Sequence, residues 1–123
     1  MNKNWVVIVV EDSYDDVQLI STVLSNSGIE VHVAKNGEEC LHLVEKFYPT
    51  LIITDLAMPK MDGWEMLGIL RDDPKTAQIP VVAISAYYSS DLAVDATAVG
   101  FAACLPKPVR PRHFVEQLTE IIG

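Results

Sequence analysis

Short runs of consecutive apolar residues alternate along this chain with stretches in which apolar residues recur every three or four positions. The runs are rich in valine and isoleucine, as is typical of strands buried in a sheet. One run alternates apolar and polar residues, which is typical of an edge strand, and the last is weak because alanine and cysteine have little strand preference. The pattern predicts strands over residues 5–10, 30–34 (the alternating run), 51–54, 80–85 and 101–105 (the weak run).

The intervening stretches show the spacing of amphipathic helices, in which one face is apolar. In the first of them, Gly28 is a predicted C-cap, and Ser13 with Asp16 resembles a capping box that has Asp in place of Glu. Helices are predicted from Ser13 up to the residues before Gly28, over about 38–47, from Gly63 onward, over about 90–99 and over about 110–122.

Regular alternation of strands and helices predicts an α/β fold with a doubly wound parallel sheet. The crossovers are expected to be right-handed, with helices on both faces of the sheet. No linker, repeat or low-complexity tract interrupts the alternation. We therefore expect one domain, covering residues 1–123.

Composition narrows the function classes. Half of the 123 residues are apolar and 21% are charged, so a packed core is expected rather than disorder. The net charge of −8 argues against binding to nucleic acid or to an anionic membrane. The two cysteines, Cys40 and Cys104, have neither the spacing of a disulfide framework nor that of a zinc site. Two acids directly follow the first apolar run, which argues against a secretion signal there. These features predict a cytoplasmic protein with reduced thiols.

Polar residues follow four of the five predicted strands. Glu11 and Asp12 follow the first strand, Asp55 the third, Ser85 ends the fourth, and Lys107 follows the fifth between two prolines. Ligands of open parallel sheets bind outside the carboxyl ends of the strands. We therefore expect three acids, a hydroxyl and a lysine to converge at one edge of the sheet.

This set of side chains suits phosphoryl transfer. Neighbouring carboxylates repel each other, and Mg²⁺ relieves that repulsion. Asp55 beside such a metal can act as a nucleophile toward phosphorus, while Lys107 and the hydroxyl of Ser85 hold the phosphoryl oxygens. Each residue alone has an ordinary explanation as a turn cap, a helix-dipole partner or a surface lysine. Their occurrence together at one edge favours a phosphoryl acceptor at Asp55.

With these motifs in view, the sequence resembles a receiver domain of the two-component response regulators over essentially the whole chain. The resemblance rests on "VVEDS", "DLAMPKMDGWE", "AISAY" and "KP", of which the second is highly specific. It implies a flavodoxin-like (βα)5 fold with strand order 2-1-3-4-5. It also implies a phosphorelay function, with a histidine kinase or phosphotransfer protein as donor and an unknown output protein as partner.

The resemblance further implies roles for individual residues. Asp55 would accept the phosphoryl group, Ser85 and Lys107 would bind its oxygens, and the peptide bond after Lys107 would be cis. Mg²⁺ would be held by three carboxylates and one main-chain carbonyl, those of Glu11, Asp12, Asp55 and Ala57. The protein would not be an enzyme, beyond catalysing its own phosphoryl transfer and autodephosphorylation.

One position departs from the family pattern. Three residues before Lys107, where most receivers carry Tyr or Phe, this chain has Cys104, so the usual aromatic route to the output surface is in doubt. That departure keeps open a constitutive interaction module with receiver fold. A turnover phosphatase ranks low because Ala57 stands where a second acid is expected. Nucleotide binding is not indicated, because no glycine-rich phosphate-binding loop follows the first strand.

Overall fold

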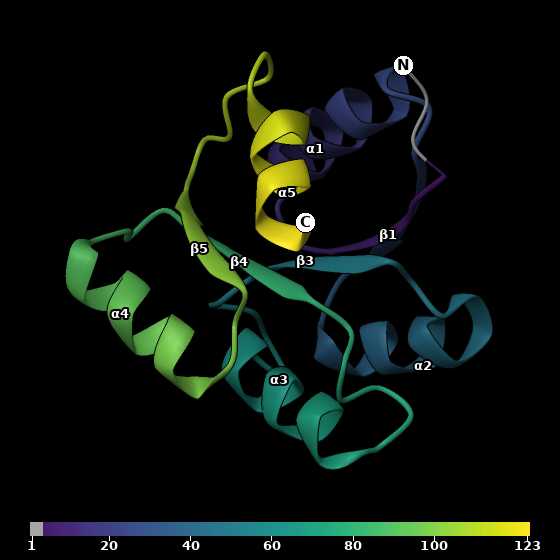
Figure 1. The fold of residues 1–123 in the computed structure, drawn as a ribbon, viewed down its shortest axis with the longest axis vertical. Helices are drawn as coiled ribbons and strands as arrows, with labels where there is room; N and C mark the ends of the chain where they lie inside the picture. The colour runs from purple at the N-terminus through teal and green to yellow at the C-terminus, as the bar shows by residue number, and fades with distance from the viewer. Residues whose placement is uncertain (1–3) are drawn as a thin grey trace.

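A parallel sheet with helices on both faces makes up the computed structural model, which describes residues 4–123 (Figure 1). Strands and helices alternate throughout, as the hydrophobic pattern predicted. The strands are β1 (Val6–Val10), β2 (Glu30–Ala34), β3 (Leu51–Asp55), β4 (Val81–Ser85) and β5 (Ala103–Pro106). The helices are α1 (Tyr14–Asn26), α2 (Gly37–Phe47), α3 (Gly63–Asp72), α4 (Ser90–Val99) and α5 (Phe114–Ile122).

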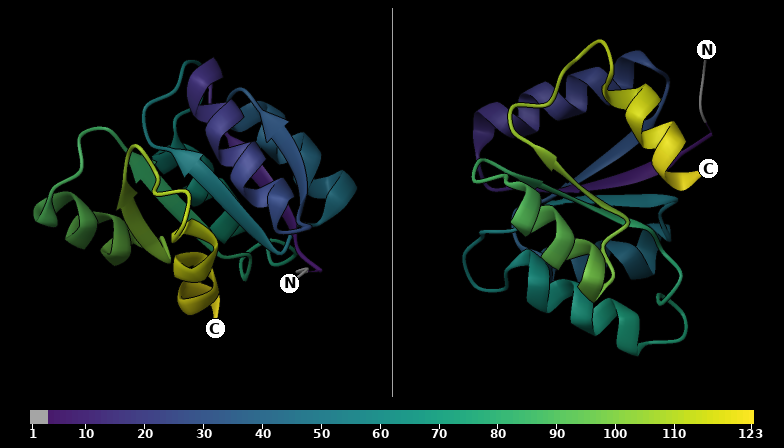
Figure 2. Two further views of the ribbon diagram at one scale, coloured as in Figure 1. Left: turned by 90° about the horizontal axis from the view of Figure 1, so that it is seen from above. Right: turned by 60° about the vertical axis from the view of Figure 1, so that its left-hand side comes forward.

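The strand order is β2-β1-β3-β4-β5, and every neighbouring pair is parallel. This confirms the predicted doubly wound, flavodoxin-like sheet of order 2-1-3-4-5. The alternating strand β2 lies at an edge, also as predicted. Figure 2 shows α1 and α5 on one face of the sheet and α2, α3 and α4 on the other. No helix in the described part of the chain is long and apolar enough to cross a membrane.

The continuous apolar runs follow from burial of the sheet on both faces. Successive side chains of a strand point to opposite faces. In β1, Val7 and Val9 pack with Ile20 of α1 and Phe114 of α5, whereas Ile8 packs in the cluster under α2, α3 and α4. Each position of a central strand therefore faces one of two cores, and none needs to be polar until the strand ends.

Two element boundaries differ from those predicted. Strand β5 begins at Ala103 rather than at Phe101, because the amide of Phe101 donates to the carbonyl of Ala96 and closes the C-terminus of α4. Gly100, with φ of 118°, provides the left-handed turn that this closure needs. Helix α5 begins at Phe114 rather than at about residue 110, because residues 110–113 first form a tight turn that includes a proline.

The predicted capping box at the start of α1 is wrong. Ser13 is the N-cap residue, but its side chain makes no capping hydrogen bond. The amide of Ser13 instead donates to the carboxylate of Glu11 at 3.0 Å. The carboxylate of Asp16 accepts a hydrogen bond from Lys107, which lies in the loop between β5 and α5. The acid that a capping box would use is therefore occupied by a tertiary contact.

Candidate functional site

The polar strand ends meet at the carboxyl edge of the sheet because the register of the strands aligns them. Val10 of β1 pairs with Thr54 of β3, so Glu11 and Asp55 follow at adjacent positions. Asp55 in turn pairs with the residue before Ser85. The structure thus brings together the residues that the sequence analysis selected, although their roles in phosphoryl transfer stay predictions.

Lys107 is the centre of the cluster. Its Nζ lies 2.6 Å from Oε1 of Glu11, 3.0 Å from Oδ2 of Asp16 and 3.1 Å from Oδ2 of Asp55. Burial alone would lower the pKa of Lys107, but the hydrogen bonds and charges of these carboxylates outweigh burial and raise it. The ammonium group is therefore firmly charged and held directly beside the proposed acceptor.

Glu11 is the buried acid of the site. Its side chain is fully enclosed, and its Oε2 accepts hydrogen bonds from the amides of Asp12 and Ser13, each at 3.0 Å. Burial raises the pKa of Glu11, the nearby charge of Asp55 adds to the rise, and the hydrogen bonds from Lys107 and Ser13 oppose it. The carboxylate is thus fixed in place at some electrostatic cost, which a second cation would reduce.

Three carboxylates lie close enough together to hold one metal ion. One oxygen each from Glu11, Asp12 and Asp55 lies within 4.8 Å of the other two. Oxygen ligands at this spacing, with Asp12 exposed to solvent, fit a small hard cation such as Mg²⁺ that keeps several waters. The amide of Ala57 lies 3.4 Å from Oδ1 of Asp55, whereas the proposed coordination by its carbonyl stays a prediction.

The loop after Asp55 is fixed by two residues of the predicted motif. Asp62 caps α3 by accepting a hydrogen bond from the amide of Glu65 at 2.9 Å. The amide of Gly63 donates to the carbonyl of Leu56 at 3.1 Å, and a Cβ on Gly63 would lie 2.7 Å from the carbonyl oxygen of Asp55. Only glycine allows the helix to start this close to the strand, so Gly63 sets the position of the tip that carries Asp55.

Ser85 ends β4, buried beside the open side of the site. Its Oγ accepts a hydrogen bond from the amide of Tyr87 at 3.0 Å, while the side chain of Tyr87 is 84% exposed. A shallow depression beside Ser85 is also lined by Ala57 and Trp64. Ser85 therefore lies beneath this depression, at the edge of the sheet where Asp55 lies.

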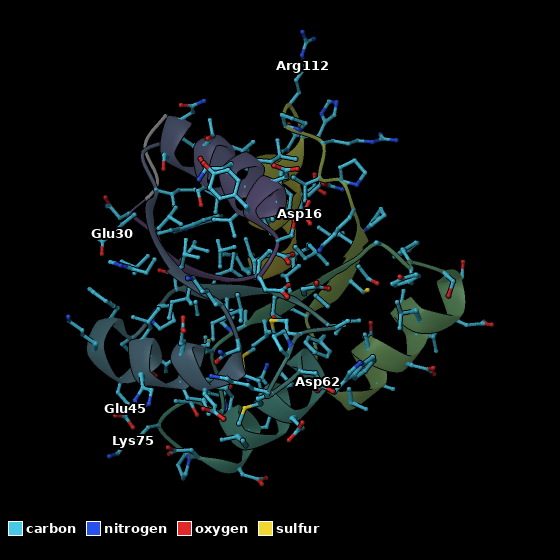
Figure 3. All side chains as sticks on the ribbon, turned by 180° about the vertical axis from the view of Figure 1, so that it is seen from behind. Asp16, Glu30, Glu45, Asp62, Lys75 and Arg112 are labelled. Carbon is cyan, nitrogen blue, oxygen red and sulfur yellow. The ribbon has the colours of Figure 1, made fainter. Side chains whose placement is uncertain are left out.

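The sequence analysis missed Asp16 as a partner of Lys107. Asp16 belongs to the first turn of α1 and lies near the chain that leads into α5 (Figure 3). Asp12 precedes the N-cap Ser13 and lies outside the helix, so no helical spacing links the two acids in the sequence. The sequence analysis assigned Asp16 to a capping box instead, and its contact with Lys107, 91 residues away, leaves no local pattern.

Two further predictions concern the stretch around Lys107. The Lys107–Pro108 peptide bond is cis, as the family resemblance implied. Cys104 stands where most receivers carry Tyr or Phe. It is a buried free thiol, and burial raises its pKa. It packs in the same cluster as Phe101, whose ring meets that of Trp64 edge to face at 5.4 Å. An aromatic pair therefore occupies the core near Cys104.

The chain is similar in sequence to known proteins. Residues 7–119 match the family described as the response regulator receiver domain. The polar-differentiation response regulator DivK of Brucella anthropi is 30% identical over 117 residues, which cover 95% of each chain. An uncharacterized 14.6 kDa protein of the sodA1 3′ region in Leptolyngbya boryana is 38% identical over 109 residues, 89% of this chain and 83% of that one.

The chain also resembles solved structures of response regulators in fold. The chemotaxis response regulator CheY4 of Vibrio cholerae superposes with a TM-score of 0.88 at 28% identity, covering 97% of this chain and 99% of that one. A putative response regulator from Chloroflexus aurantiacus gives a TM-score of 0.90 at 27% identity, with 98% of both chains covered. The chain therefore belongs to the family of response regulator receiver domains.

Proposed function

We propose that this receiver domain is switched by phosphorylation of Asp55. The observation that carries the proposal is the position of Lys107, whose Nζ lies 3.1 Å from the Asp55 carboxylate while Glu11 and Asp12 lie in the same cluster. An aspartate that only caps a turn at the end of a strand needs no buried ammonium group beside it. An acceptor of a charged phosphoryl group does.

The side chains divide the work of the transfer. An oxygen of Asp55 attacks phosphorus, the bond from phosphorus to the donor histidine breaks, and the imidazole leaves with the electron pair of that bond. Lys107 neutralises charge on the phosphoryl oxygens, and the hydroxyl of Ser85 turns to donate to one of them. Mg²⁺, held by Glu11, Asp12 and Asp55, would supply further positive charge when bound.

The partners follow from this chemistry. A histidine kinase or a phosphotransfer protein is the proposed donor, and an output protein reads the phosphorylated state. The domain acts on no other substrate and catalyses only its own phosphoryl transfer and autodephosphorylation. The predicted cytoplasmic location stays a prediction.

A constitutive interaction module is the second candidate, and the small side chain of Cys104 at the usual ring position is the observation in its favour. The complete acid, serine and lysine set argues against it, because a module that ignores phosphate has no use for Lys107 bonded to Asp55. A turnover phosphatase is not supported, since Ala57 offers no second acid beside Asp55.

Intact-mass measurement tests the acceptor. Wild-type protein treated with acetyl phosphate and Mg²⁺ is expected to gain one phosphoryl group, and Asp55→Asn is expected to gain none. Asp73→Asn serves as the matched control, because Asp73 lies in the loop before β4, at the opposite edge of the sheet. Equal adducts on wild type and Asp55→Asn would contradict the assignment of Asp55.

A further inference from the structure

Lys107 has as many carboxylate partners as it has N–H donors. An ammonium group carries three donors, and Glu11, Asp16 and Asp55 each place an oxygen within 3.1 Å of Nζ. The contacts with Asp16 and Asp55 are hydrogen bonds and the contact with Glu11 is an ion pair, so a phosphoryl oxygen that comes to Lys107 competes with partners already in place. Which partner leaves determines how readily the site accepts phosphate.

We propose that Asp16 is a positioning residue that competes with the phosphoryl group for Lys107, an inference that rests on the proposed phosphorylation of Asp55. In the unphosphorylated protein Asp16 holds one donor of Lys107. When the phosphoryl group arrives, that donor turns to a phosphoryl oxygen and Asp16 is released to water. Asp16 thereby lowers the affinity of the site for a phosphoryl group.

Burial decides that Asp16 is the partner released. The side chain of Glu11 is 0% exposed, so loss of Lys107 would leave a buried carboxylate without its cation. Asp55 is the acceptor and stays beside the group that it binds. The side chain of Asp16 is 28% exposed at the start of α1, so water replaces its lost hydrogen bond at little cost.

Asp15 provides a matched control for this contact. It lies in the same first turn of α1, is exposed, and has no ion pair with Lys107 among the described residues. Asp15→Asn and Asp16→Asn remove the same charge from neighbouring positions. A difference between the two variants therefore reports the contact with Lys107 rather than the net charge of the helix end.

Beryllofluoride, a mimic of the phosphoryl group, is the probe for the first measurement. With saturating Mg²⁺, Asp16→Asn is expected to bind beryllofluoride about three- to tenfold more tightly than wild type, the range of a partly exposed ion pair. Asp15→Asn is expected to change affinity by less than about twofold. Asp16→Glu, which keeps the carboxylate, is expected to stay close to wild type.

A spectroscopic readout separates this role from a purely structural one. The NMR resonance of Nζ of Lys107 is expected to shift in Asp16→Asn and not in Asp15→Asn. Thermal denaturation of both variants checks that they are folded. Equal affinities for Asp15→Asn and Asp16→Asn, or weaker binding by Asp16→Asn, would overturn the inference. Wild-type protein that gains no phosphoryl group from acetyl phosphate would instead overturn the proposed function itself.

Discussion

The sheet has a carboxyl edge, where its parallel strands end, and an amino edge, where they begin, and the two edges carry different kinds of polar contact. At the carboxyl edge, acids crowd around one cation, Lys107, and repel each other. At the amino edge, side-chain donors reach main-chain carbonyls: Thr76 donates to Leu70 at 2.6 Å, and Arg71 donates to Ile79 at 2.8 Å. Ion pairs around Lys107 dominate the first edge, and hydrogen bonds to main-chain carbonyls hold the loop at the second.

The two edges therefore contribute differently to the stability of the folded state. A buried carbonyl without a donor costs free energy, so each side-chain donor at the amino edge stabilises a loop that would otherwise be under-bonded. At the carboxyl edge, burial raises the pKa of Glu11, so the folded state loses stability as the pH rises from the ordinary pKa of a glutamate to the raised pKa of Glu11. The proposed binding of a cation beside Glu11 would offset this cost.

The largest expected effect on metal binding is at Asp12. In Asp12→Ala, Mg²⁺ affinity measured by calorimetry is expected to fall at least about tenfold, because one of three carboxylates is lost. The free energy of unfolding without metal is expected to rise by about 0.5–1 kcal/mol as repulsion from Glu11 and Asp55 is relieved.

Asp72→Ala is the control for that measurement. Asp72 is exposed at the end of α3 that leads to the amino edge, and its removal changes the net charge equally. Its Mg²⁺ affinity is expected to match wild type. An Asp12→Ala variant that binds Mg²⁺ as well as Asp72→Ala would show that the metal lies elsewhere or does not bind.

The carboxyl edge was largely predictable from sequence, and the amino edge was not. Strand ends are visible as points where an apolar run stops at a charged residue, so Glu11, Asp55 and Lys107 could be placed at one edge from the alternation alone. Arg71 and Thr76 bond carbonyls of residues six or more positions away, and nothing in the local pattern marks those acceptors. Tertiary contacts of this kind decide loop structure without leaving a periodic signal.

The same limit explains the errors at the ends of elements and at Asp16. The start of β5 depends on the closure of α4 by Phe101, which requires the left-handed turn at Gly100. The partner of Asp16 is 91 residues away along the chain. A pattern read over one or two helical turns has no access to either contact.

At the amino edge, the expected effect is on stability and not on phosphorylation. In Thr76→Val, the hydroxyl that donates to the buried carbonyl of Leu70 is lost, and the free energy of unfolding is expected to fall by about 1–3 kcal/mol. Phosphorylation of Asp55 by acetyl phosphate is expected to continue at the wild-type rate. Denaturant unfolding and intact mass measure the two outcomes.

Thr97→Val separates burial from the chemical change. The hydroxyl of Thr97 also donates to a carbonyl, that of Ala93 at 2.8 Å, but it lies on the exposed surface of α4. Its loss is expected to cost less than about 0.5 kcal/mol. A Thr76→Val variant as stable as Thr97→Val, or one that loses phosphorylation, would remove the distinction between the two edges.

The smallest expected effect is a local change in amide exchange when beryllofluoride and Mg²⁺ are added. The amide of Tyr87 donates to Oγ of Ser85, and that acceptor is lost when the hydroxyl turns to a phosphoryl oxygen. Helix α4 follows this loop and is weakly anchored, since Ala96 is its buried residue while Val94 and Val99 are exposed. Protection is therefore expected to change over residues 86–99.

Strand β5 and the amino-edge loop at residues 73–80 set the comparison for that experiment. Without a ring at Cys104, the movement of Ser85 has no side chain to draw inward, so exchange over residues 101–105 is expected to change little. The loop bonded through Thr76 is expected to change less still. Changes centred on β5 would show that Phe101 or another residue of that strand carries the signal. No change outside the acidic cluster would favour the constitutive module, because phosphate would then reach no surface that a partner can bind.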